Sequence, residues 1–166
     1  MDTNVQNAIN EQIRHELESG YLYLAMSAHF EAANLPGFAR WMRLQAQEEL
    51  GHAMRLFDFL IDRGGRIELQ ALGKPPAEFG TPFSIFEQAL AHEREVTGLI
   101  DRLHEIALTK KDYATQAFLQ WFITEQVEEE KSASTAVEQL RMANNAAAAL
   151  LMLDAKFGAR SAAGGD

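Results

Sequence analysis

Acidic side chains interrupt the apolar stripes of four separate helical segments of this chain. A helix in a bundle turns one residue in every three or four toward the core, and those positions are normally apolar. The first stripe reads Ile9, Ile13, Glu16, Gly20, Tyr23, Ser27 and Phe30, so one glutamate lies among uncharged residues. Three later stripes show the same interruption, at Glu49, Glu93 and Glu129.

Two of these glutamates have a second polar residue on the same stripe. His52 follows Glu49 by three residues, and Gln126 precedes Glu129 by three. Residues three apart lie on one helix face, and a carboxylate beside an imidazole suits metals such as iron. Because Glu49 shares its helix face with His52, it is the residue best placed to bridge two ions.

The four glutamates need positive charge if they meet in a dry core. An ionised carboxylate buried alone costs several kcal/mol, and like charges nearby add repulsion. No lysine or arginine lies on the four stripes. Two Fe(II) ions would balance four carboxylates, and two Fe(III) ions with a bridging oxide would balance them equally. The few donors would leave open positions for O2 or H2O2.

The elements that must position these residues are helices separated by proline, glycine and asparagine. The four prolines lie at 36, 75, 76 and 82. Apolar periodicity predicts helices over about 5–33, 36–63, 84–109, 112–143 and 146–157, with a capping box at Ser84 and Glu87 and a cap at Asp112. The long segment 66–82 is a crossover. This pattern predicts an all-α, antiparallel four-helix bundle with one long crossover and a short fifth helix.

Composition limits the classes of protein that are compatible with this chain. The 166 residues, 47% of them hydrophobic, predict one domain over 1–157, followed by a disordered tail at 158–166. The absence of cysteine excludes disulfides and thiolate metal sites, and a net charge of −9 opposes nucleic-acid binding. No run approaches the ~20 apolar residues of a membrane span, and the start is not basic, so we expect a cytoplasmic protein without a membrane partner.

At these residues the chain resembles the prokaryotic non-haem ferritins of the ferritin-like di-iron superfamily. The resemblance extends from Asn10 to about Phe157 and is carried by the segments NEQIRHELESGYLYLAMSA, AQEELGHAMRLFDFL, AHE at 91–93 and DYATQAFLQWFITEQVEEEK. It implies that the first iron is bound by Glu16, Glu49 and His52. It also implies a second iron bound by Glu49, Glu93 and Glu129, with Gln126 as a glutamine of the same site.

The resemblance extends to residues around the two irons. It implies a third, weaker iron position near Glu48, Glu125, Glu128 and Glu129. Tyr23 lies seven residues after Glu16 on the same face, where it could donate a hydrogen bond to a ligand or an electron during oxidation. Haem is not expected, because Leu50 replaces the methionine that binds it in bacterioferritins, and the 112–143 segment lacks a second Glu-x-x-His.

The function implied by the resemblance is iron storage with ferroxidase activity. Fe(II) would be oxidised with O2 or H2O2, and ferric oxyhydroxide would be stored inside a homo-oligomeric shell of 24 subunits, with residues 146–157 at its fourfold contacts. One alternative is a small di-iron redox enzyme, of the peroxide reductase or oxygenase type, that stores no iron. Another is a metal-free helical interaction protein whose acidic residues face solvent.

Overall fold

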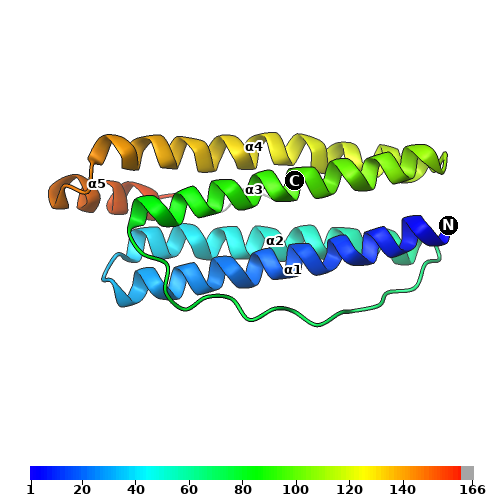
Figure 1. The fold of residues 1–166 in the computed structure, drawn as a ribbon, viewed down its shortest axis with the longest axis horizontal. Helices are drawn as coiled ribbons and strands as arrows, with labels where there is room; N and C mark the ends of the chain where they lie inside the picture. The colour runs from blue at the N-terminus through cyan, green and yellow to red at the C-terminus, as the bar shows by residue number, and fades with distance from the viewer. Residues whose placement is uncertain (162–166) are drawn as a thin grey trace.

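The computed structural model describes residues 1–161, which form five α-helices and no strand. The helices are α1 (Thr3–Ala32), α2 (Pro36–Asp62), α3 (Pro82–Thr109), α4 (Tyr113–Ala143) and α5 (Ala147–Gly158). Figure 1 shows two antiparallel hairpins, α1 with α2 and α3 with α4, joined by a crossover that runs the length of the bundle. The predicted fold class is confirmed. In the described part of the chain, no helix has the length and apolar character to cross a membrane.

The ends of the helices lie close to their predicted positions, with one error in the capping. Asp112 caps α4 as predicted, accepting a hydrogen bond from the Thr115 amide at 3.1 Å. The predicted cap at Ser84 is wrong, because α3 already begins at Pro82 and Thr81 accepts from the Ser84 amide at 3.2 Å. Proline has a fixed backbone angle that suits the first helical position, so the helix starts one half-turn earlier.

The segment predicted as a tail, 158–166, is described only in part. Gly158 is the last residue of α5, and 159–161 continue from it in the described structure. The rest of that segment, 162–166, lies outside the described residues.

The core consists of two apolar clusters with a polar layer between them. One cluster contains Phe30, Phe38 and Phe86, and the other contains Leu56 and Phe122. Along each of the four long helices, the glutamate of the stripe falls between residues of the two clusters. The stripe positions are buried throughout except at the end of the second stripe, where Phe59 is half-buried.

The short helix α5 docks on the first turn of α2. Neither α2 nor Leu35, its N-cap residue, provides a side-chain hydrogen bond to the first amides of that helix. Asp154 of α5 takes this role and accepts a hydrogen bond from the Phe38 amide at 2.8 Å. Gly37 permits this approach, because a Cβ there would lie 1.7 Å from the Asp154 carbonyl oxygen. Phe157 then packs on Phe38 with ring centroids 5.2 Å apart. The position of α5 is therefore set by direct contact with the α2 backbone.

Replacing Asp154 tests this docking. Among the described residues, Asp154 provides the only side-chain cap of α2, so Asp154→Ala should lower the free energy of unfolding by about 1–2 kcal/mol. Asp154→Asn keeps an acceptor oxygen and should restore most of that loss, as measured by chemical denaturation. Equal losses in the two variants would show that the cap is not the source of the stabilisation.

Candidate metal centre

The four stripe glutamates meet in the interior of the bundle. Glu16, Glu49 and Glu93 are each 1% exposed, and Glu129 is 6% exposed. They come from α1, α2, α3 and α4 in that order. This burial contradicts the alternative in which the acidic residues face solvent through a misjudged helical register.

His52 joins two compact groups of possible ligands. One ligand atom each from Glu16, Glu49 and His52 lies within 4.8 Å of the others, and the same holds for His52, Glu125 and Glu129. Trp121 packs edge-on against the imidazole, with ring centroids 5.4 Å apart. The imidazole is thus held at the junction of α2 and α4.

Gly20 allows α1 and α2 to approach each other beside these ligands. A Cβ on Gly20 would lie 3.2 Å from the Ala46 carbonyl oxygen and 3.6 Å from the Glu49 Cβ. The first distance is shorter than ordinary van der Waals contact, so a larger residue would push the helices apart. The small residue on the first stripe therefore helps to bring Glu16 and Glu49 together.

Glutamine side chains from α1 and α2 each donate a hydrogen bond to one carboxylate. The Gln12 amide nitrogen lies 2.9 Å from Glu16 Oε1, and the Gln45 amide nitrogen lies 2.8 Å from Glu129 Oε2. Both glutamines are buried. Each bond fixes one oxygen of its carboxylate in place and leaves the other oxygen outside that bond.

Glu93 receives hydrogen bonds from α1 and α4. The Tyr23 hydroxyl donates to Glu93 Oε1, and the Gln126 amide nitrogen lies 3.3 Å from Glu93 Oε2. Gln126 also donates to the Glu93 carbonyl at 3.2 Å. Tyr23 and Gln126, both expected near the site, thus donate to the same carboxylate of this layer.

Two carboxylate oxygens stay without a donor. Among residues 1–161, Glu16 Oε2 and Glu49 Oε2 are the buried side-chain polar atoms that have no hydrogen-bond partner. His52 Nδ1 lies 3.4 Å from Glu49 Oε2 without forming a hydrogen bond. A buried acceptor left unpaired costs about 1–3 kcal/mol, and more when it is charged. Both atoms belong to the first ligand group, so a cation bound there would satisfy them.

Burial and mutual repulsion raise the pKa values of the four glutamates. Burial is the main cause for Glu16 and Glu49, whose pKa values lie well above the ordinary value; the charge of Glu49 adds to the shift at Glu16, and that of Glu93 to the shift at Glu49. Burial also raises the pKa of Glu93, and burial with the charge of Glu93 raises the pKa of Glu129 to about 7. Without cations, the layer therefore takes up protons.

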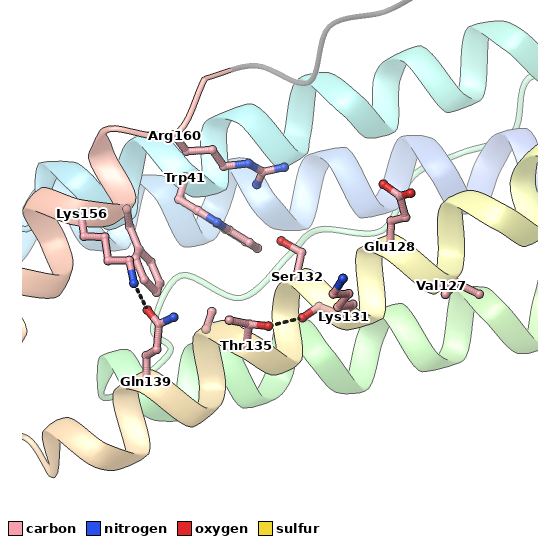
Figure 2. A pocket seen from close by; sticks show the side chains of 11 residues that line it. Trp41, Val127, Glu128, Lys131, Ser132, Thr135, Gln139, Lys156 and Arg160 are labelled. Carbon is pink, nitrogen blue, oxygen red and sulfur yellow. Dashed lines mark hydrogen bonds between the residues drawn. The ribbon is translucent and has the colours of Figure 1, made fainter.

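The residues of the expected third iron position are only partly brought together. Glu48 and Glu125 are half-buried, and Glu128 is exposed on the wall of a pocket of about 570 Å³ between α2, α4 and α5 (Figure 2). Within residues 1–161, the compact ligand groups include Glu125 and Glu129 but neither Glu48 nor Glu128. Glu48 instead forms an ion pair with Arg160 at 2.8 Å.

Several residues around the centre were not predicted from sequence as site residues. Gln12 lies four residues before Glu16, and Gln45 lies four before Glu49 on the predicted stripe, so helical spacing could have indicated both. Thr97 donates to the Glu93 carbonyl at 3.0 Å. Arg160 offered no comparable indication, because it lies on no stripe and contacts residues more than a hundred positions earlier in the chain.

A four-helix bundle with carboxylates and a Glu-x-x-His pair in its core is the architecture of the ferritin-like di-iron proteins. Comparison with known proteins agrees with that class. Residues 6–143 match the ferritin family, described as a ferritin-like domain. The chain belongs to the ferritin family.

Individual relatives match almost the full chain. A bacterial non-heme ferritin from Bacteroides fragilis is 45% identical over 156 residues, which is 94% of this chain and 97% of the relative. One from Staphylococcus aureus is 35% identical, covering 97% of each chain. An open pore ferritin from Archaeoglobus fulgidus, known from crystal structures, superimposes with a TM-score of 0.96 at 46% identity, covering 97% of this chain and 99% of that one. The resemblance stated from the residues alone is confirmed.

The raised pKa of Glu129 predicts how the stability of the metal-free protein depends on pH. Between pH 4.5, the ordinary pKa of a glutamate, and about 7, the folded protein holds a proton on Glu129 that the unfolded chain has released. Stability conferred by this group is therefore highest at acidic pH and is lost as pH rises toward 7. Glu129→Gln removes the titration, so this variant should gain up to about 3 kcal/mol relative to the parent between pH 4.5 and pH 8.

The measurement is the free energy of unfolding of both proteins, after treatment with a chelator, across that pH range. Glu87→Gln, at an exposed glutamate of α3, serves as the matched control, and its difference from the parent should stay constant. A difference between Glu129→Gln and the parent that does not change with pH would contradict the raised pKa.

Proposed function

We propose that this chain stores iron in the cytoplasm and oxidises Fe(II) at a di-iron centre inside each bundle. The observation that carries the proposal is the buried layer of four glutamates and one histidine, in which Glu16 Oε2 and Glu49 Oε2 have no hydrogen-bond donor among the described residues. Metal cations offer the charge and the coordination that these oxygens lack. The names of the relatives, bacterial non-heme ferritins, support iron as that metal.

Iron is the substrate of this site, and it would occupy two positions there. Glu16, Glu49 and His52 would bind the first Fe(II), since their ligand atoms lie within 4.8 Å of one another. Glu49, Glu93 and Glu129 would bind the second. Glu49 would bridge the two ions, because it belongs to the first group and its pKa is raised, after burial, by the charges of Glu93 and Glu129.

The oxidation transfers two electrons to each molecule of oxidant and requires few protein groups. Two Fe(II) ions release two electrons, which reduce O2 to H2O2, or H2O2 to water, with protons taken from solvent. Tyr23 is fully buried and its hydroxyl donates to Glu93. Burial, with the charge of Glu93, raises the pKa of Tyr23 well above 10, so the phenol stays protonated and available as hydrogen-bond donor or electron donor.

The two positions should hold iron unequally. If the first ion takes His52 together with Glu16 and Glu49, the second ion, at Glu49, Glu93 and Glu129, would be bound by carboxylates alone. An ion held by oxygen ligands that still carry hydrogen bonds from Gln45, Tyr23 and Gln126 should dissociate more readily. Glu125, with Glu48, Glu128 and Glu129, would then form the third position, through which ferric iron leaves the centre.

Storage requires a container larger than one bundle, so the proposal includes a hollow shell of 24 subunits that holds ferric oxyhydroxide. The outer surface of α5 supports its place in contacts between subunits. Leu151 and Met152 are 61% and 75% exposed there, although both are apolar. Exposed apolar side chains on one short helix are the kind of surface that subunit contacts bury.

Ligand substitution tests the oxidation site. His52→Ala and Glu49→Ala each remove a ligand of the first iron, and Glu49→Ala also removes the bridge. Both should slow the initial oxidation of Fe(II), followed by the absorbance of the ferric product, by at least tenfold, about the effect of weakening a metal site. His104→Ala is the control, because His104 contacts Gln120 outside the centre. An initial rate that is unchanged in His52→Ala would show that the site is wrongly assigned.

Iron content and particle size together test storage. Storage predicts light scattering from a 24-subunit particle and an iron content far above the about two ions per chain that one bundle centre holds. A dimer with about two irons per chain would instead indicate the small redox enzyme. That result would support the di-iron centre and contradict the storage proposal.

A further inference from the structure

Arg160 lies along one face of α2, although it follows the end of α5. Its Nη2 donates to Glu48 Oε2 at 2.8 Å and its Nη1 donates to Gln45 Oε1. Its guanidinium carbon lies 4.9 Å from the centre of the Trp41 ring. Trp41, Gln45 and Glu48 are spaced by four and three residues, so they share a face of the helix. Three contacts to one helix face hold this arginine in a defined position.

Gln45 connects this arginine to the metal centre. A guanidinium only donates hydrogen bonds, so the amide oxygen of Gln45 must face Arg160. The amide nitrogen must then face the other way, and it lies 2.8 Å from Glu129 Oε2. Gln45 is fully buried, which leaves it little freedom to rotate. Arg160 is therefore one side chain removed from a proposed iron ligand.

Glu48 is the charged partner of Arg160 and lies within electrostatic reach of the centre. The pKa of Glu129 is raised mainly by burial, next by the charge of Glu93, and further by the charge of Glu48. The ion pair is mostly shielded from water, with side chains 23% exposed for Arg160 and 16% for Glu48. At this burial a charged hydrogen bond is stronger than a typical surface ion pair.

The docking of α5 sets where the guanidinium lies. Gly158 contacts Gly37 so closely that a Cβ on Gly158 would lie 2.9 Å from the Gly37 Cα. Asp154 fixes the same helix to the Phe38 amide. Figure 2 shows Arg160 extending beside Trp41 while Lys156, on the same helix, is directed to Gln139, which it contacts at 3.1 Å. Arg160 and Lys156 therefore contact different partners.

We propose that Arg160 is a positioning residue that acts as a tethered counter-cation, so that a divalent cation binds Glu48 only by displacing the guanidinium. The inference rests on the proposed iron function and adds a regulator to it. With Arg160 in place, cations bind weakly beside Glu48. They bind preferentially at Glu16, Glu49 and His52. When an ion arrives at Glu48, the guanidinium moves away from Gln45 and Glu129 as well.

The test measures Zn(II) binding to the assembled, iron-free protein by titration calorimetry, since Zn(II) does not change oxidation state. Arg160→Gln removes the competing charge and should tighten one binding event of lower affinity by about tenfold, the effect of one charged hydrogen bond. Lys156→Gln is the matched control: it removes one positive charge from the same pocket, four residues before Arg160, and should leave that event unchanged.

A second substitution, at Glu48, tests whether the gain in Zn(II) affinity has the proposed origin. In an Arg160→Gln, Glu48→Gln double variant the tenfold gain should disappear, which a general loosening of α5 would not cause. Unchanged affinity in Arg160→Gln, an equal gain in Lys156→Gln, or a gain that persists in the double variant would each overturn the inference. Absence of tight Zn(II) binding in the parent would instead overturn the proposed di-iron function, so the two failures are distinguishable.

Discussion

The burial of four glutamates beside one another determines how the interior of this bundle is built. Their placement between two apolar clusters removes them from water, and the consequence is visible in their raised pKa values. Replacing them with apolar residues would give an ordinary bundle core. Such a layer is retained only if the free energy released when cations bind offsets the cost of folding without them.

The bundle reduces this cost without removing the capacity to bind metal. Hydrogen bonds from Gln12, Tyr23, Gln45 and Gln126 reach carboxylate oxygens of the layer. All four donors are neutral, so they orient the carboxylates but do not neutralise them. The unpaired oxygens belong to Glu16 and Glu49, which form a compact ligand group with His52. The residual need for charge is thus concentrated where a first cation would bind.

Sequence periodicity was sufficient to predict the helices and the burial of the four glutamates, because burial of a helix face depends on spacing within that helix. It was insufficient where local signals conflict and where an interaction joins helices. The α3 start was misjudged because two local signals conflict: the spacing of Ser84 and Glu87 favours a cap at Ser84, whereas Pro82 favours the cap at Thr81 that the structure shows. Whether Gln45 donates to Glu129 depends on the distance between α2 and α4, which no pattern along the chain encodes.

The short helix α5 acts on α2 at two points, and this connects distant parts of the molecule. Asp154 caps the first turn of α2, and Arg160 contacts its middle beside the metal centre. Both contacts depend on the same close approach of Gly37 and Gly158, so a shift of α5 would alter both together. If the exposed face of α5 is buried between subunits, as proposed, assembly would hold Arg160 in place. The charge beside Glu48 would then depend on the assembled state.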